Sequence, residues 1–362
     1  MKKILALLLL ACMIFALAAC GQQAAPAEQP APAEEPAPAE APVEAPVEEP
    51  APAEAEYKLG MGVSLNMDSS KTELAQVDAC AAAVVLDAEG KIVACRIDVA
   101  QNKMTVTDGQ VVTDAAYPPK QEKGFDYGMV AYGGATYEWF EQAAAFEQYV
   151  VGKTGAEIAA METVVNESGH TVTTDETLYA SCSISISDFQ EAVVKACNDE
   201  QGMTFKAAGE FTLGLAINSK SDESTAATAD ADGVVKMYSE FGAAVVGADG
   251  KILAALTDAT QPQIQINAAG EIVETVFKGT KRELMEGYNM VAYSSATLEW
   301  YQQAWNFAEY AVGKTADELR ASETVLNEEG HQVFTDETLY ASVSISVDGM
   351  INVVAKAADN AR

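Results

Sequence analysis

The stretch ATYEWFEQAAAFEQYVVGKT at residues 135–154 returns later in the chain as ATLEWYQQAWNFAEYAVGKT at residues 296–315. Two further pairs of segments flank it: AAVVLDAEGKIVA (82–94) with GAAVVGADGKILA (242–254), and ETVVNESGHTVTTDETLYASCSIS (162–185) with ETVLNEEGHQVFTDETLYASVSIS (323–346). A repeat this long has the size of a domain, well above the roughly 20–50 residues of a solenoid unit. We therefore predict two copies of one domain, over residues 57–206 and 207–362.

Each copy is predicted to begin with strands and to continue with helices. The turn Asp87–Gly90 lies between two apolar runs and predicts a β-hairpin, because Gly90 can adopt a positive φ. Residues 137–151 carry apolar side chains at helical spacing. The alternating segment 181–187 predicts another strand, followed by a helix from about Asp188. This order is typical of the α+β class, here an antiparallel sheet with helices packed on one face.

The N-terminus has the layout of an export signal. Lys2 and Lys3 precede an apolar run, and residues 17–20, Leu-Ala-Ala-Cys, resemble the lipobox of bacterial lipoproteins. We predict a signal peptide over residues 1–19. Cleavage would leave Cys20 to carry acyl chains such as palmitate, which anchor the chain to the cell membrane on its extracytoplasmic face. A plain signal peptide with an incidental cysteine is the alternative.

A low-complexity segment follows the anchor. Residues 24–56 consist almost only of Ala, Pro, Glu and Val. Recurrent proline favours extended backbone and removes amide donors. Such a segment cannot bury enough surface to fold, so we predict that residues 20–56 form the lipid-anchor cysteine and a disordered linker that acts as a spacer.

The composition excludes several classes of function. There are 54 acidic and 22 basic residues, so the formal net charge is −32. A nucleic-acid partner is not expected, since lysines and arginines would have to neutralise the phosphates. The chain has only two histidines, and no metal-ligand spacing is present, so no metal site is predicted. No catalytic residue can be identified, which favours an electron carrier or a binding protein over an enzyme.

Four cysteines lie in the first copy only. They are Cys80, Cys95, Cys182 and Cys197, and the second copy has Glu240, Ala255, Val343 and Ala358 in their places. Their joint presence predicts two disulfides in an exported domain, and Cys80–Cys95 with Cys182–Cys197 is the favoured choice among three connectivities. The alternative is a set of small buried apolar side chains.

Aromatic residues recur at equivalent places in both copies. Tyr132 and Trp139 in the first copy correspond to Tyr293 and Trp300 in the second. Their rings offer a flat ligand a stacking surface. An ordinary core stripe explains the two tryptophans as well.

Two segments together resemble the FMN-binding domain of membrane-attached bacterial flavoproteins. They are the hairpin Asp-x-x-Gly-Lys-Ile at residues 87–92 and the closing segment Leu-Tyr-Ala-Ser-Cys-Ser-Ile-Ser at residues 178–185. In that family a flavin transferase attaches FMN to a threonine through a phosphoester, and lipoproteins with two such domains serve extracellular electron transfer. The resemblance therefore implies FMN as cofactor, a flavin transferase as partner and a link to a quinone-dependent redox chain.

The same resemblance assigns candidate FMN-binding residues. Ser183 and Ser344 stand at the acceptor position, and Thr136 and Thr297 belong to a second, partial match. At the position of the family's glycine this chain has Ser181. Two functions remain open at this point. One is a flavin-dependent electron carrier, and the other is a non-enzymatic surface binding or adhesion module that keeps the fold without the cofactor.

Overall fold

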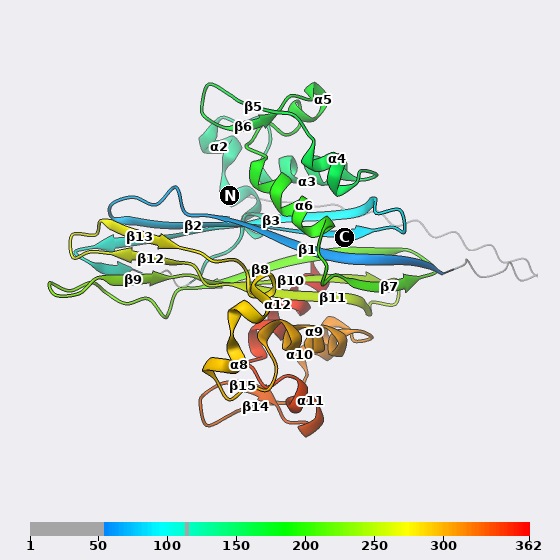
Figure 1. Cartoon of the computed structure of the whole chain (residues 1–362). Coiled ribbons are helices and arrows are strands. Elements are labelled where there is room, and N and C mark those ends of the chain that lie inside the picture. The colour runs from blue at the N-terminus through cyan, green and yellow to red at the C-terminus, as the bar shows by residue number, and fades with distance from the viewer. Residues whose placement is uncertain (1–53, 113–115) are drawn as a thin grey trace, which may run out of the picture. The chain divides into compact units, whose positions relative to one another are not determined.

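The computed structural model describes residues 54–112 and 116–362 (Figure 1). The predicted signal peptide, Cys20 and nearly all of the predicted linker lie outside the described residues. The described residues belong to one compact unit that contains both copies of the sequence repeat. No helix in the described part of the chain has the length and apolar character of a membrane span.

In each copy the long strands come first, and helices with shorter strands follow. The elements up to the junction are β1 (Ala55–Asn66), β2 (Leu74–Leu86), β3 (Ile92–Thr107), β4 (Gln110–Val112), α1 (Lys120–Lys123), η1 (Gly124–Tyr127), α2 (Met129–Gly133), α3 (Trp139–Val150), α4 (Gly155–Ala159), β5 (Thr163–Val165), β6 (Thr171–Thr173), α5 (Glu176–Tyr179), α6 (Ser187–Cys197) and β7 (Met203–Ala207). Those that follow are β8 (Phe211–Lys220), β9 (Gly233–Lys236), β10 (Tyr238–Gly247), β11 (Ile252–Thr260), β12 (Gln263–Ile266), β13 (Ile272–Val276), α7 (Lys281–Leu284), η2 (Met285–Tyr288), α8 (Met290–Tyr293), α9 (Trp300–Ala311), α10 (Ala316–Arg320), β14 (Thr324–Leu326), β15 (Gln332–Phe334), α11 (Glu337–Ser342) and α12 (Asp348–Asp359).

The sheets are antiparallel, which confirms the predicted α+β class. One sheet has five strands in the order β4-β3-β2-β1-β7. After the junction the strands divide into two three-stranded sheets, β11-β10-β8 and β13-β12-β9. The hairpin predicted at Asp87–Gly90 joins β2 to β3, and Gly90 has a φ of 76°.

The strand predicted over residues 181–187 is wrong. The amides of Ser181 and Cys182 donate to the carbonyl of Leu178, which prolongs the turn of α5. The amide of Ser183 donates to the side chain of Gln142 instead of a neighbouring strand. Residues 181–186 therefore form a loop, and α6 begins at Ser187.

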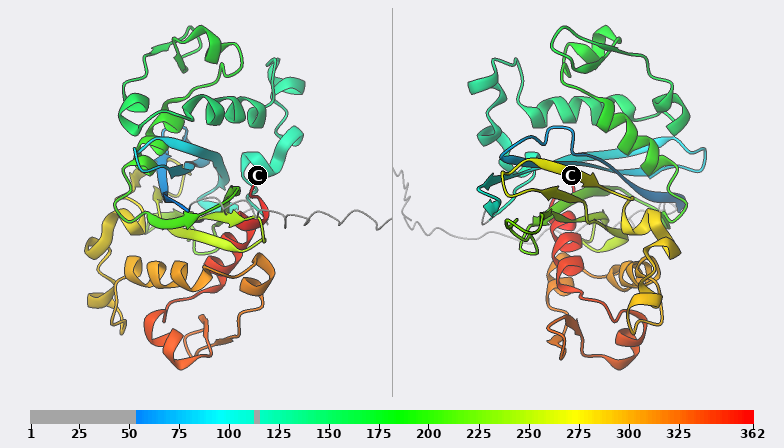
Figure 2. Two further views of the ribbon diagram at one scale, coloured as in Figure 1. Left: turned by 90° about the vertical axis from the view of Figure 1, so that its right-hand side faces the viewer. Right: turned by 60° about the vertical axis from the view of Figure 1, so that its left-hand side comes forward.

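Helices, sheet, sheet and helices form four layers (Figures 1 and 2). Alternate residues of a strand face opposite sides of a sheet. In β2, Ala82 and Val84 pack under α3 and α6, while Ala81 and Ala83 pack against the sheet β11-β10-β8. The outer face of that second sheet is covered by α9 and α12. Both faces of the central strands are thus buried, which explains their continuous apolar sequence.

Helices α6 and α12 lie very close to the strands beneath them, and glycine makes this possible. A Cβ added at Gly62 of β1 would lie 2.4 Å from the carbonyl oxygen of Ala192 in α6. At Gly214 of β8 the corresponding distance, to the carbonyl oxygen of Ala357 in α12, is 1.8 Å. These separations are too short for any side chain, so the helix positions depend on these glycines.

We expect Gly62→Ala to lower the free energy of unfolding by about 1–3 kcal/mol, because α6 must move away from the sheet. Urea unfolding monitored by circular dichroism measures the change. Gly209→Ala is the matched control, since a Cβ at Gly209 has no neighbour within 4 Å and no unusual φ. Equal unfolding midpoints for the two variants would contradict the close packing.

Candidate functional site

Each copy has a cavity beside the tryptophan that begins its long helix. The first cavity, of about 400 Å³, lies beside Trp139, and the second cavity, of about 670 Å³, lies beside Trp300. Seven lining residues of the first cavity have equivalents in the second: Gln101 and Gln261, Lys120 and Lys281, Met129 and Met290, Trp139 and Trp300, His170 and His331, Ile184 and Ile345, and Ser185 and Ser346. The two cavities are therefore equivalent sites of the repeat.

A lysine rests on aromatic rings at each cavity. Lys120 Nζ lies 4.9 Å from the ring centroid of Tyr127 and 5.3 Å from that of Trp139. In the second cavity Lys281 Nζ lies 4.9 Å from the ring centroid of Tyr288 and 5.2 Å from that of Trp300. The electron-rich faces of these rings attract an ammonium group. Each lysine begins a short helix, α1 or α7, that follows the strands.

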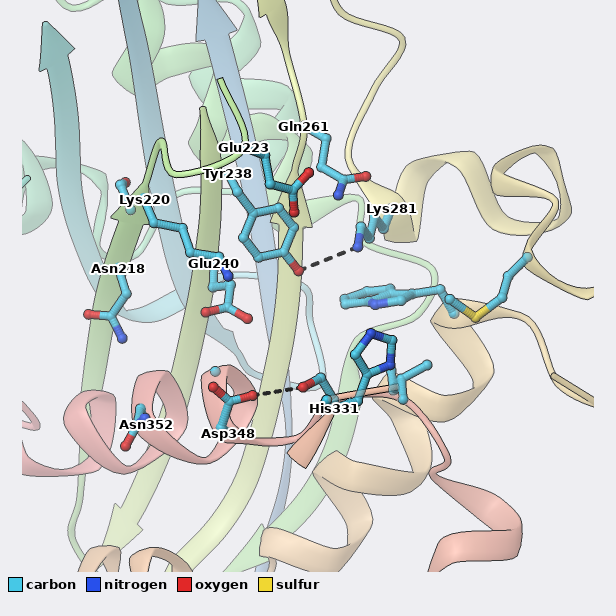
Figure 3. A pocket seen from close by; sticks show the side chains of 17 residues that line it. Asn218, Lys220, Glu223, Tyr238, Glu240, Gln261, Lys281, His331, Asp348 and Asn352 are labelled. Atoms are coloured by element: carbon cyan, nitrogen blue, oxygen red, sulfur yellow. Dashed lines mark hydrogen bonds between the residues drawn. The ribbon is translucent and has the colours of Figure 1, made fainter. Parts of the chain in front are cut away.

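These ammonium groups have few polar partners. Lys120 Nζ forms no hydrogen bond or ion pair with another described residue. Lys281 Nζ has one such contact, a hydrogen bond of 3.4 Å that it donates to the hydroxyl of Tyr238 (Figure 3). An ammonium group has three hydrogens to donate. Both cavities therefore have N–H donors for an acceptor that the described residues do not supply.

Carboxyl groups line both cavities, but not at the same positions of the repeat. The first cavity has Asp188 in the first turn of α6 and Asp78 on β2. The second cavity has Glu240 on β10, Asp348 in the first turn of α12, and Glu223. Cys80 stands at the position of Glu240 in the first copy, and Gly349 stands at the position of Asp188 in the second. A Cβ on Gly349 would lie 1.9 Å from Glu240 Oε1, so the strand carboxylate requires glycine on the helix.

Burial shapes the protonation of these groups. It raises the pKa of Glu240 to about 7, and Asp348 adds to the effect while Lys220 and Lys281 oppose it. The pKa of Asp188 is also raised, by burial first and then by Glu191 and Asp78. Burial lowers the pKa of Lys281 to about 8, against the influence of Glu240 and Asp258.

The residues predicted from sequence divide into two groups. Trp139 and Trp300 line the cavities and are each 3% exposed. Tyr132 and Tyr293 are 91% and 86% exposed and line neither cavity, so the structure does not bring these two tyrosines together with the tryptophans, and their stacking stays a prediction.

Of the four predicted FMN-binding residues, only Ser183 lines a cavity. Ser183 lines the first cavity, and its amide and hydroxyl donate to Gln142 Oε1 at 3.0 and 3.4 Å. Ser344 makes the same two bonds to Gln303 Oε1, at 2.8 and 3.2 Å, but is not part of the second cavity's lining. Thr136 and Thr297 are exposed and lie outside both linings.

The four cysteines of the first copy are free thiols in the structure, so the two predicted disulfides are not present in it. In the register of β2 and β3, Cys80 pairs with Val99 and Cys95 pairs with Val84. Cys80 and Cys95 are therefore four positions apart along the sheet, about 13 Å at ~3.3 Å per residue, which is too far for a bridge. Cys182 precedes α6 and Cys197 ends it. Burial raises the pKa of Cys182 to about 12, as expected for the alternative of buried apolar residues.

Sequence reasoning missed the two lysines and the two carboxyl groups. Their one signal was that Lys120 and Lys281, like Tyr127 and Tyr288, keep the offset of the repeat. In the part of the chain that the structure describes, no group of three or more His, Cys, Asp or Glu side chains is placed to hold a metal ion.

Comparisons with known proteins give no further guide. No protein-family model matches the chain, and neither a curated protein nor a solved structure matches it.

We expect Glu240→Gln to change how stability depends on pH. A carboxyl whose pKa is higher in the folded than in the unfolded chain makes folding less favourable as pH rises between the two values. Between pH 5 and pH 7.5 the wild-type protein should thus lose about 1–3 kcal/mol of unfolding free energy relative to Glu240→Gln. This window lies below the pKa of Lys281. Urea unfolding at both pH values measures the difference.

The control for this prediction is Glu328→Gln at an exposed turn position. Like Glu240→Gln, it removes one carboxylate from a strongly acidic chain. A pH dependence that changes equally in both variants would contradict the assignment to Glu240.

Proposed function

We propose that the protein is a membrane-anchored extracytoplasmic lipoprotein with two similar repeats, residues 57–206 and 207–362, each of which binds a small molecule in its cavity. The observation that carries the proposal is the recurrence of one polar and aromatic lining around a hollow in both copies. The lipobox-like sequence ending at Cys20 supports the location, and the Ala/Pro/Glu-rich segment supports a spacer between membrane and binding unit.

Energetics favour binding over a purely structural role for these residues. Holding an ammonium and a carboxyl group partly buried costs free energy unless both are paired. A core needs only apolar residues at such places. Lys120 and Lys281 are nevertheless kept in both copies, together with a carboxyl group from one element or the other. A ligand that pairs with them explains why the cost is tolerated. The proposal is a binding function without catalytic turnover.

A second candidate is covalent flavin carriage, and the position of Ser183 favours it. This hydroxyl lines the first cavity, where a flavin transferase would attach FMN through its phosphate. The flavin would supply the redox chemistry for electron transfer toward a quinone-linked chain. Asp78 and Asp188 share the lining and repel a phosphate, which is why this candidate ranks second. Co-expression with a flavin transferase tests it, because attachment adds the mass of FMN and visible absorbance that Ser183→Ala removes.

We expect small polar ligands to stabilise the mature chain, residues 20–362, and the effect to depend on the two lysines. Thermal unfolding in the presence of a small-molecule library identifies such ligands, since a ligand that binds only the folded state raises Tm. The double variant Lys120→Met/Lys281→Met should lose the rise. The matched control is Lys103→Met, at an exposed position on β3. An absent rise, or one that the double variant retains, would refute the proposal.

A further inference from the structure

Each cavity is lined by a lysine and a carboxyl group that do not form an ion pair with each other. Lys120 and Asp188 both line the first cavity, and Lys281 and Glu240 both line the second, together with Lys220. The Lys120 ammonium lowers the pKa of Asp188, against the larger effect of burial, and Lys220 and then Lys281 act on Glu240 in the same direction. Among the described residues, however, neither pair forms a hydrogen bond or an ion pair. Figure 3 shows the Lys281 amine and the Glu240 carboxylate on either side of the Tyr238 hydroxyl.

The ammonium group of each lysine lies against aromatic rings, so its N–H groups remain available to donate to a ligand. Aromatic faces satisfy the charge of Lys120 and Lys281 but accept no strong hydrogen bond. The matching ligand group is an anion with oxygen acceptors, such as a carboxylate.

The carboxyl group of each pair has few donors of its own. The Glu240 carboxyl group accepts no hydrogen bond from the described residues. Asp188 accepts one long bond, 3.5 Å, from Asn66 Nδ2. The matching ligand group is a donor with positive charge, such as an ammonium. The first copy has Asp188 on the helix and Cys80 on the strand, whereas the second copy has Gly349 on the helix and Glu240 on the strand. One carboxyl group is thus carried by the helix in the first copy and by the strand in the second. Asp348, Glu223 and Lys220 add further charges to the lining of the second cavity.

We propose that each cavity binds a zwitterion, an α-amino acid or a very short peptide. Its carboxylate would lie on Lys120 or Lys281 and its ammonium at Asp188 or Glu240. The volumes, about 400 and 670 Å³, lie in the range of small-ligand sites. The second cavity is the larger of the two and therefore accommodates the very short peptide. This inference rests on the proposed binding function and specifies its ligand class.

Calorimetric titration of the mature chain tests the ligand class. The probes are leucine, glutamate and dialanine, each compared with its amide, which lacks the carboxylate, and with its N-acetyl derivative, which lacks the ammonium. We expect at least one parent zwitterion to bind and either derivative to bind about tenfold or more weakly. An amide or N-acetyl derivative that binds as tightly as its parent overturns the inference.

Variants assign the two charges to their cavities. Asp188→Asn should remove binding at the first cavity, and Glu240→Gln should remove it at the second, with Lys103→Met as the unaffected control. The double variant Cys80→Glu/Asp188→Gly gives the first cavity the arrangement of the second and should bind, whereas Asp188→Gly alone should not. Binding that survives Asp188→Asn and Glu240→Gln together contradicts the assignment.

The outcomes separate this inference from the proposed function. If library compounds raise Tm through the two lysines while none of the amino-acid or dipeptide probes binds, the ligand class is wrong and the binding function stands. If no compound of either set binds, both are wrong. Circular dichroism of each variant shows whether a loss of binding comes from misfolding.

Discussion

The structure depends on the burial of two alanine-rich sheet faces against each other. Ala79, Ala81 and Ala83 of β2 face the inner side of the second sheet, where Ala243 and Val245 of β10 are buried in the same cluster. Small side chains let the sheets approach closely, and the other face of each sheet is already covered by helices. Without this contact each copy would expose an apolar sheet face to water. The repeat therefore folds as one unit built from two copies, not as two separate globules on a string.

The sites depend on the same arrangement. Helices α6 and α12 lie against glycines of the strands, and the N-terminal turns of these helices border the two cavities. The copies also support each other directly. Arg282, next to Lys281, forms an ion pair of 3.1 Å with Asp199, which follows α6 of the first copy, and both side chains are less than 10% exposed. Such a buried pair adds little net stability, but it fixes geometry.

Much of the fold was predictable because its signals are local. The hairpin at Asp87–Gly90 and the helix within residues 137–151 follow from turn residues and spacing, and the structure has both. The strand predicted over residues 181–187 was wrong because alternation of Ser and Ile also suits a loop whose amides are satisfied by side chains. Gln142 provides that bond from a distant helix, and no local pattern encodes it.

The site was less predictable because the residues that line each cavity are far apart in the sequence. Trp139 and Trp300 were found, since a repeated Glu-Trp pair is visible in the sequence. Lys120 and Lys281 were missed, as no motif marks them. The disulfide predicted between Cys80 and Cys95 is wrong because the register of β2 and β3 separates the two cysteines along the sheet. The spacing of cysteines in the sequence does not reveal that register. The exchange between Asp188 and Glu240 becomes visible only when strand and helix are seen together.

Differential scanning calorimetry of the mature chain tests the shared core most directly. A single folded unit unfolds in one transition whose calorimetric and van't Hoff enthalpies agree. This is the result expected if the two sheet faces stabilise each other. Two separable transitions, one for residues 57–206 and one for residues 207–362, would show that each copy is stable alone and would contradict a shared core.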